Sequence, residues 1–353
     1  MKKYSIASIP GDGIGKEVID AGVEVLQALA NKSREFQLDI TSFPWGTDYY
    51  LETGRMMPED GLQQLKDFDA IYFGSAGDPR VPDHLSLWGL RLAICQPFDQ
   101  YANVRPSRLL PGITSPLRDV ETGDLDWVIV RENTEGEYSG AGGRVHTGHS
   151  AEVGLDVAVF TRDGIERVQR FALELAQTRP AKHLTLVTKS NAQRHGMVMW
   201  DDIFNLIKGD YPDVTTDKML VDAMTTRMVL DPTSLDVIVA TNLHADVLSD
   251  LAAALTGSMG IAPTANLNPE RKYPSMFEPI HGSAFDIMGK GIANPIGACW
   301  SASMMLEHLG EHESAAALMK AIEGLTDDGS LLPADLGGDA TTIQIRDAII
   351  ARL

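Results

Sequence analysis

Two aspartates, Asp246 and Asp250, stand four residues apart in Ala245–Leu255, where the spacing of apolar residues predicts a helix. Residues at i and i+4 share one helix face, so both carboxylates should project from the same side. Like charges at this spacing destabilise a helix by about 0.2–0.5 kcal/mol, which favours a cation between them. Asp222 could add a third oxygen ligand, and an all-oxygen set suits Mg²⁺ or Mn²⁺. The alternative is a solvated acidic face on a very acidic chain.

Three arginines, Arg105, Arg108 and Arg131, could bind carboxylates, because a guanidinium group offers a planar pair of donors. Arg131 follows the apolar stretch Trp127–Val130, which is predicted to be a strand, and ligands gather at strand ends in α/β sheets. Arg105 precedes Pro106, which is expected to end a helix or shape a loop. Each of these arginines alone could equally be an ordinary surface residue.

A lysine and a tyrosine add candidate acid–base groups. Lys189 ends the predicted strand Leu184–Thr188, and a nearby metal ion would lower its pKa toward neutrality. Tyr138 lies seven residues beyond Arg131, at the start of a glycine-rich polar segment that is expected to form an extended arm. Taken singly, both residues are also compatible with a surface position.

Two glycine-rich segments could approach a ligand with their backbone. Gly11–Gly15 is a weak dinucleotide motif, because the third glycine comes one residue too early for G-x-G-x-x-G. The segment Glu278–Asp286 combines small residues with a histidine, and its Asp286 could accept hydrogen bonds from ribose hydroxyls. An ordinary turn with a buried histidine, His281, is the alternative.

These residues must be positioned by alternating strands and helices, which predict an α/β fold with a largely parallel sheet. The expected strands are 4–9, 37–43, 70–73, 127–130, 184–188 and 235–240, and the expected helices are 16–30, 62–68, 164–176, 197–207, 245–255 and 297–309. A chain of 353 residues is long enough for two domains.

The overall charge limits the partners. With 30 basic and 49 acidic residues, the net charge is 30 − 49 = −19, which disfavours nucleic acid and anionic membranes. No apolar run is long enough to span a membrane, and the N-terminus becomes polar before a signal peptide could form. Two distant cysteines, Cys95 and Cys299, indicate a reducing compartment, so a cytoplasmic location is expected.

Seven motifs spread along nearly the whole chain closely resemble the β-decarboxylating dehydrogenases, the family of isopropylmalate and isocitrate dehydrogenases. They are PGDGIG (10–15), NVRP (103–106), VRENTEGEY (130–138), VTKSN (187–191), VDAM (221–224), NLHADVLSD (242–250) and EPIHGSAFDIMGKGIANP (278–295). Several long motifs in a fixed order are far more specific than any one of them.

The resemblance implies a two-domain α/β/α sandwich that is not a Rossmann fold. One domain, residues 1–103 plus 260–353, would bind the cofactor. The other, residues 104–259, would bind substrate and metal and form the dimer, with an extended arm near 138–155. The implied partner is a second copy of the chain, and the implied homodimer has shared active sites.

The resemblance also implies roles for the candidate residues. Asp222, Asp246 and Asp250 would bind Mg²⁺ or Mn²⁺, with Lys189 and Asp222 reaching the partner's site. Arg105 and Arg131 would hold the substrate carboxylates. Lys189 would relay the proton of the C2 hydroxyl, and Tyr138 would protonate the enolate carbon once CO2 has left.

The implied redox cofactor is NAD, because an acid at Asp286 would repel the 2′-phosphate of NADP. Asn191 would lie near the nicotinamide and Asn294 near the adenine. The other implied cofactor contacts are Glu278, His281, Gly282, Ser283 and Ala284. Whether K⁺ is also required stays open.

The chain departs from the family where substrate specificity is set. Most members carry an arginine ten residues before the position of Arg105, and this chain has Cys95 there. Arg91 would share a face with Cys95 if the helix is regular, and it is predicted to bind substrate. The segment Asp83–Gly89 resembles the branch that acts on tartrate and D-malate, which favours a C4 2-hydroxy diacid with decarboxylation of D-malate to pyruvate and CO2.

Three alternatives remain. An isopropylmalate dehydrogenase of leucine biosynthesis would prefer isopropylmalate to D-malate. A non-catalytic regulator on the same scaffold should have lost Tyr138 or Lys189, and both are present. A plain Rossmann hydroxyacid dehydrogenase would need no divalent metal.

Overall fold

The computed structural model describes residues 1–353, and the chain forms two compact units. The first combines both ends of the chain: Met1–Gln100, Pro106–Leu125 and Ala253–Leu353. The second is built from the middle, Tyr101–Arg105 and Asp126–Ala252. Residues 106–125 and 253–259, which were expected in the middle domain, pack with the first unit. Strand β4 (Ala102–Arg108) contributes residues to both units.

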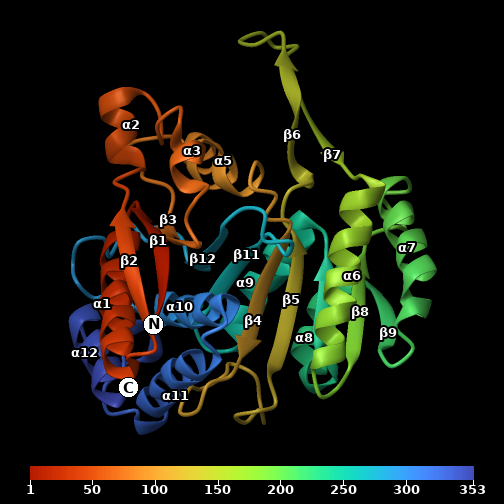
Figure 1. Ribbon diagram of the computed structural model, residues 1–353. Helices are drawn as coiled ribbons and strands as arrows, with labels where there is room; N and C mark the ends of the chain where they lie inside the picture. Colours follow the sequence, from red (N-terminus) through yellow and green to blue (C-terminus); the bar gives the residue numbers. More distant parts are fainter. The chain divides into compact units, whose positions relative to one another are not determined.

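The first unit is a mixed sheet with helices around it (Figure 1). Its strands follow the order β2-β1-β3-β12-β11; all neighbours are parallel except β11 and β12, which are antiparallel. The antiparallel pair separates this sheet from an all-parallel Rossmann arrangement. Its elements are β1 (Lys2–Gly11), α1 (Gly15–Ser33), β2 (Phe36–Ser42), α2 (Thr47–Thr53), α3 (Gly61–Leu65), β3 (Ala70–Ser75), α4 (Asp83–Ser86), α5 (Leu92–Cys95), β11 (Pro263–Leu267), β12 (Ser275–Pro279), α10 (Ile296–Leu309), α11 (His312–Asp328) and α12 (Thr342–Arg352).

Helix α1 forms because its apolar residues recur on one face, and that face is buried. Val18, Leu26 and Leu29 are among the residues that it buries, and the helix packs beside α10 and α12. The helix ends where Arg34 adopts a left-handed conformation with φ of 58°. Central strand β3 is buried along its whole length, and the Tyr72 hydroxyl donates to the carbonyl of Ala298 in α10 over 2.8 Å.

The glycine-rich turn after β1 packs against the protein's own backbone. A Cβ on Gly11 would lie 1.9 Å from the carbonyl oxygen of Ser75, and one on Gly13 would lie 2.1 Å from that of Ser283. The buried Asp12 carboxylate accepts from the Thr47 amide at 2.7 Å and the Gly77 amide at 2.9 Å. The glycines are therefore required by close packing within the first unit, in keeping with the weak match to a dinucleotide motif.

The segment before β4 was expected to be a regular α-helix, but it is interrupted. Between α4 and α5, Leu87–Arg91 forms a π-helical turn. The π-turn ends at Arg91, and the α-helical turn Leu92–Cys95 follows it, so the irregularity precedes the stretch that joins Arg91 to Cys95. Cys95 is fully buried in an apolar cluster with Leu90 and Met56.

The second unit contains an all-parallel sheet with strand order β5-β10-β8-β9. Its helices and strands are β5 (Asp126–Glu132), β6 (Gly136–Val145), β7 (Val153–Val159), α6 (Arg162–Thr178), β8 (His183–Thr188), α7 (Gly196–Ile207), β9 (Thr215–Leu220), α8 (Val221–Leu230), β10 (Val237–Ala240) and α9 (Asn242–Leu255). Both α6 and α7 pack against this sheet (Figure 1). Arg105 lies inside strand β4 rather than in the loop or at the helix end predicted from Pro106.

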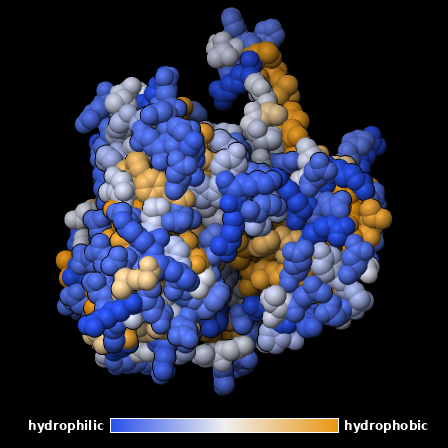
Figure 2. Space-filling model, in the orientation of Figure 1, coloured by the Kyte–Doolittle hydropathy of each residue, from blue (hydrophilic) through white to orange (hydrophobic).

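Strands β6 and β7 form a separate antiparallel hairpin that projects from the second unit, where the sequence predicted an arm (Figure 1). Its strand pairing places Val145 opposite Val153 and Gly143 opposite Leu155, so apolar side chains line one face. Five large apolar residues of the hairpin are exposed: Val145, Val153, Leu155, Val157 and Val159. They form part of the apolar stripe on the arm in Figure 2. No helix of the chain has the length and apolarity needed to cross a membrane.

Candidate active site

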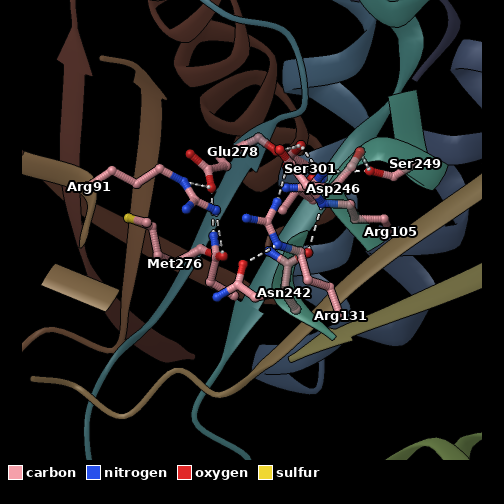
Figure 3. Close-up of polar contacts among 12 residues, drawn as sticks. Arg91, Arg105, Arg131, Asn242, Asp246, Ser249, Met276, Glu278 and Ser301 are labelled. Atoms are coloured by element: carbon pink, nitrogen blue, oxygen red, sulfur yellow. Dashed lines mark hydrogen bonds and ion pairs between the residues drawn. The ribbon is translucent and has the colours of Figure 1, made fainter. Parts of the chain in front are cut away.

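Arg131 is the penultimate residue of strand β5, in register with Ala240 at the carboxyl end of β10. Its guanidinium group is 3% exposed and donates to two residues of helix α9. Nε donates to the Asn242 amide oxygen at 2.8 Å, and Nη1 donates to Asp246 Oδ1 (Figure 3). The carboxyl ends of parallel strands and the start of the following helix therefore bring these groups together, as strand order predicts.

Arg105 reaches the same carboxylate from strand β4. Its Nη1 donates to Ser249 Oγ at 2.6 Å and to Asp246 Oδ1 at 3.4 Å. Its Nε donates to Asn103 Oδ1 at 2.8 Å, and its guanidinium is also nearly buried. Two nearly buried guanidinium groups thus contact the carboxylate of Asp246.

Tyr138 joins this cluster from the first residues of β6. Its ring lies against the guanidinium of Arg131, whose Cζ is 5.2 Å from the ring centre. Its hydroxyl donates to Asp246 Oδ2 at 3.3 Å. The predicted substrate arginines and the predicted tyrosine therefore converge on Asp246, which is one of the predicted metal ligands.

Asp250 lies one turn further along α9, on the face predicted from its spacing. Partial desolvation, and then the charge of Asp246, raise the pKa of its carboxyl group above the ordinary value. Arg105 and Arg131 act in the opposite direction. A carboxylate in this position is one that a bound cation would stabilise.

Lys189 and Asp222 form a separate pair in the second unit. Lys189 follows β8, and its Nζ donates to Oδ1 of Asp222 in the first turn of α8. This hydrogen bond lowers the pKa of Asp222. No group of three or more His, Cys, Asp and Glu side chains within the chain is placed to hold a metal ion. Asp222 therefore does not complete a three-aspartate site with Asp246 and Asp250 of its own chain.

In the first unit, the loop after β12 contains most of the predicted cofactor residues. His281 is buried; its Nδ1 is 3.0 Å from the Gly282 carbonyl oxygen, while its Nε2 is buried without a hydrogen-bond partner. Burial lowers the pKa of His281, so the ring is neutral at pH 7. Ser283 is buried, and its carbonyl accepts from the Ile14 amide at 2.9 Å. Ala284 has a left-handed conformation with φ of 40°.

The other predicted cofactor residues differ in exposure. Asn294 is buried, and its Nδ2 donates to Asp335 Oδ2 at 3.0 Å. Asp286, in the loop of the first unit, and Asn191, in the turn after Lys189 of the second, are exposed. Among the predicted cofactor residues, some are therefore buried and held in place, and others are polar and exposed.

Arg91 and Glu278 form an ion pair within the first unit (Figure 3). Arg91 Nε donates to Glu278 Oε1 at 2.8 Å, and Nη2 donates to Asn266 Oδ1 at 3.1 Å. Glu278, predicted as a cofactor contact, has Arg91 and Asn266 as its side-chain partners. The same segment exposes Trp88, which lines a pocket of about 510 Å³ with Met56 and Leu85 among its walls.

Sequence reasoning missed the polar residues that hold the arginines. Asn242 and Ser249 lie at i−4 and i+3 from Asp246, so helical spacing could have found them. Asn103 lies two residues before Arg105, which is same-face spacing in a strand. Asn266 carries no such signal, because its partner Arg91 lies 175 residues away.

Comparison with known proteins identifies the family. The family model described as isocitrate/isopropylmalate dehydrogenase matches residues 5–349. The chain therefore belongs to the isocitrate/isopropylmalate dehydrogenase family, and the predictions of this family, of its non-Rossmann α/β fold and of an oxidoreductase are confirmed. A solved isocitrate dehydrogenase from Methylococcus capsulatus superimposes with a TM-score of 0.89 at 35% identity, covering 100% of this chain and 99% of that one.

Within the family, the chain is similar to enzymes named for C4 acids. It is 65% identical to a probable tartrate dehydrogenase/decarboxylase of Agrobacterium vitis, over 99% of this chain and 97% of the relative. It is 50% identical to the D-malate dehydrogenase (decarboxylating) of Escherichia coli K12, over 99% of this chain and 98% of the relative.

Proposed function

We propose that the protein oxidises a C4 2-hydroxy diacid, tartrate, D-malate or both, with NAD, and decarboxylates D-malate to pyruvate and CO2. The observation that carries this proposal is the convergence of Arg105, Arg131 and Tyr138 on Asp246. The names of its relatives, which include tartrate dehydrogenase/decarboxylase and D-malate dehydrogenase, support this substrate class.

Arg105 and Arg131 bind the carboxylates of the substrate. In a chain of net charge −19, two buried guanidinium groups provide the local cationic donors that a dianion needs. The two guanidinium groups are oriented by hydrogen bonds that they donate to Asn103, Asn242 and Ser249. The arginines therefore lose little side-chain entropy when the substrate binds.

Lys189 and Tyr138 move the protons. When bound, NAD would accept the hydride of C2. Lys189 accepts the proton of the C2 hydroxyl, which leaves a 2-keto acid. The bond between C3 and the departing carboxylate then breaks, and its electron pair forms the enolate of the remaining three carbons. The Tyr138 hydroxyl, oriented by Asp246 and by the guanidinium of Arg131, donates a proton to C3.

Asp246 and Asp250 fit a divalent cation. They offer only oxygen ligands from one helix face, and because desolvation and the charge of Asp246 raise the pKa of Asp250, a bound cation would stabilise its carboxylate. We assign the third ligand to Asp222 of a second copy of the chain, because Asp222 does not complete the group within one chain. When bound, Mg²⁺ or Mn²⁺ would act as a Lewis acid that stabilises the enolate.

The loop 281–286 and Asn294 fit NAD. His281 has a buried Nε2 without a partner, and a Cβ on Gly282 would meet nothing within 4 Å, so backbone and ring can approach a ligand. Ser283 and Ala284 continue this loop, Glu278 precedes it, and Asn191 is the proposed contact near the nicotinamide.

Asp286 is proposed to select NAD over NADP, because its exposed carboxylate can accept from ribose hydroxyls and repels a 2′-phosphate. Asp286→Ser should lower the NAD/NADP ratio of kcat/KM by roughly ten-fold, since one charge repulsion and one hydrogen bond are lost. Steady-state assays with both dinucleotides measure this ratio. If it stays unchanged, Asp286 does not contact the ribose.

The arm supports a homodimer with shared active sites. An isolated two-stranded hairpin is at best marginally stable, and this one exposes an apolar face. A second copy of the same face would cover it. Both cysteines are buried and neither forms a disulfide, which supports a reducing compartment such as the cytoplasm.

The experiment that tests the function is a substrate panel with D-malate, both tartrates, isopropylmalate and isocitrate. Each acid is assayed with NAD and Mn²⁺, with and without K⁺ and EDTA, and NADH and CO2 are scored separately. The proposal expects NADH from tartrate or D-malate, CO2 from D-malate, and loss of both in EDTA. Preferential turnover of isopropylmalate would contradict it, as would full activity in EDTA.

A further inference from the structure

Asn294 is held by the first unit at both ends of its side-chain amide. It is 6% exposed and lies two residues before helix α10. Its Oδ1 accepts from the Ile296 amide at 3.0 Å, and its Nδ2 donates to Asp335 Oδ2 at 3.0 Å. A backbone amide only donates and a carboxylate only accepts, so these two partners fix which end of the side chain is oxygen and which is nitrogen. The protein therefore sets the orientation of the Asn294 amide.

Asp335 lies in the short 3-10 turn 334–336 and is itself held by the segment around Ser258. The Ser258 hydroxyl donates to Asp335 Oδ2, and its oxygen accepts from the Gly260 amide at 2.9 Å. A Cβ on Gly260 would lie 2.4 Å from Asp335 Oδ2 and 3.1 Å from Nδ2 of Asn294. Three chain segments of the first unit thus meet closely, and glycine is needed where they meet.

Asn294 and Asp335, called here the amide–carboxylate pair, place a donor beside an acceptor. The Nδ2 group of Asn294 carries two hydrogens, and Asp335 accepts one of them. Oδ2 of Asp335 accepts from Asn294 and Ser258, whereas Oδ1 accepts from no group of the chain, and the residue is exposed. A ligand that matches the pair must therefore present an acceptor next to a donor.

The amide–carboxylate pair lies beside the loop that is proposed to bind NAD. The Ile280 amide, one residue before His281, donates to the Ala262 carbonyl at 2.9 Å. Ala262 belongs to the same chain segment as the serine and the glycine that pack against Asp335. Burial lowers the pKa of His281, and the charge of Asp335 is among the influences that raise it, so this carboxylate lies near the ring. Loop 281–286 and the pair are thus neighbours within the first unit.

The amino group of adenine has the complementary pattern. It is a donor, and the ring nitrogens on either side of it, N1 and N7, are acceptors. Either edge of adenine therefore presents an acceptor next to a donor. Hypoxanthine carries a carbonyl oxygen in place of the amino group, and a carboxylate disfavours that oxygen because neither group has a hydrogen to donate. The pair suits adenine on both edges and hypoxanthine on neither.

We propose that Asn294 and Asp335 read the 6-amino group of adenine. Asp335 Oδ1 accepts from the amino group, and Asn294 Nδ2 donates to the adjacent ring nitrogen. Ser258 is a positioning residue that acts through Asp335. The inference rests on the proposed function, which supplies NAD as the ligand. It gives a role toward the cofactor to Asp335, which was not predicted from the sequence.

The test is equilibrium binding of ADP-ribose and of its hypoxanthine counterpart, inosine diphosphate ribose, measured by calorimetry without turnover. The wild-type protein should bind ADP-ribose roughly ten- to hundred-fold more tightly, the range for a hydrogen bond to a charged group. Asp335→Asn should bring the two Kd values within about two-fold, because an amide can rotate to donate to the carbonyl oxygen. Asn294→Ala should lower the preference roughly ten-fold.

Two further variants test the positioning and keep both reading residues. Ser258→Ala removes the hydroxyl that donates to Asp335, and Gly260→Ala places a methyl group against Asp335 Oδ2. Each should lower the preference for ADP-ribose by about three- to ten-fold. A merely structural role would weaken the binding of both ligands equally and leave the ratio of their Kd values unchanged.

Asp339→Asn is the matched control, because it makes the same change of charge at an exposed position four residues further along. Its ratio should equal that of the wild type. The inference is overturned if the wild-type protein binds both ligands equally, if Asp335→Asn keeps the preference, or if Asp339→Asn lowers it as much. Binding of ADP-ribose in these cases leaves the proposed NAD site standing. A wild-type protein that does not bind ADP-ribose would overturn that site together with the inference.

Discussion

Asp246 accepts hydrogen bonds from three side chains that come from three different strands: Arg105, Arg131 and Tyr138. In the absence of a cation, the two arginines neutralise it. When metal and substrate bind, the proposal requires Asp246 to coordinate the metal while the arginines turn to the substrate carboxylates. The exchange replaces one set of charge pairs by another, so the site stays close to electroneutral throughout.

Asp250 is proposed to be needed for the metal and not for the fold. Asp250→Asn removes a charge without removing bulk, and the raised pKa shows that this charge is disfavoured in the metal-free protein. We expect turnover at limiting Mn²⁺ to fall by about a hundred-fold or more, while the metal-free melting temperature stays the same or rises. Metal titrations of activity and thermal melts in EDTA measure the two effects.

The matched control for this prediction is Asp202→Asn, which removes one charge from an exposed position on α7 of the same unit. It should alter neither the metal dependence nor the melting temperature. Full turnover of Asp250→Asn at limiting metal would remove Asp250 from the ligand set.

His308 should make the stability of the protein depend on pH. Burial and the neighbouring Arg271 lower its pKa from 6.5 to about 4. Below pH 6.5 the unfolded chain binds a proton that the folded chain does not, so stability is lost as the pH falls from about 6.5 toward 4. Between pH 7 and pH 5 the wild-type protein should lose free energy of unfolding, and His308→Phe should reduce this loss by about 2 kcal/mol. Urea unfolding at both pH values measures it, and equal losses in both proteins would contradict it.

Among the elements, those with a strong local signal could be predicted from the sequence. Helix α1, the buried strand β3 and helix α9 all formed where periodicity placed them. On α9 the spacing also placed Asp246 and Asp250 on one face. Prediction succeeded there because the side-chain repeat of a helix fixes which residues share a face.

Other elements depend on distant partners and could not be predicted locally. Arg105 was expected in a loop because of Pro106, but both residues lie in strand β4, where neighbouring chain segments outweigh local preference. The π-turn at Leu87–Arg91 depends on the packing of Gly89 on Met56. The pairing of Arg91 with Glu278 joins residues 187 positions apart, which no spacing rule covers.

The hairpin β6–β7 is proposed to hold the dimer together through its apolar face. Leu155→Lys places a charge on that face, where Leu155 is 61% exposed in the single chain. Because a buried lysine without a partner is costly, we expect the dimer dissociation constant to rise by about a hundred-fold. Analytical ultracentrifugation over a concentration series measures this change.

Asp156→Asn is the matched control for the hairpin. It makes the same change of one charge unit on the neighbouring residue, whose side chain points to the opposite face. Its dissociation constant should equal that of the wild type. A dimer that Leu155→Lys leaves intact would show that the pairing surface lies elsewhere.

At the scale of the whole molecule, we propose that a single subunit does not hold a complete active site. The middle of the chain builds the second unit, and there Lys189 and Asp222 pair with each other while Asp246 pairs with the arginines and Tyr138. All of these residues belong to one unit, yet no metal-binding group of three forms among them. A site shared between two copies would bring the two clusters together without any rearrangement inside a chain.

Subunit complementation tests this sharing directly. Lys189→Ala and Asp246→Asn should each be inactive alone, because each defect disables every site of its own homodimer. After the two variants are mixed, unfolded and refolded together, half of the dimers are mixed, and each mixed dimer has one intact site. We therefore expect about a quarter of the wild-type activity to return. Lys189→Ala mixed with Asp222→Asn is the control: both residues are donated by the same chain, so every site keeps one defect and no activity should return. No recovery in either mixture would show that each subunit builds its own site, and equal recovery in the two mixtures would contradict the proposed donation of Lys189 and Asp222 by one chain.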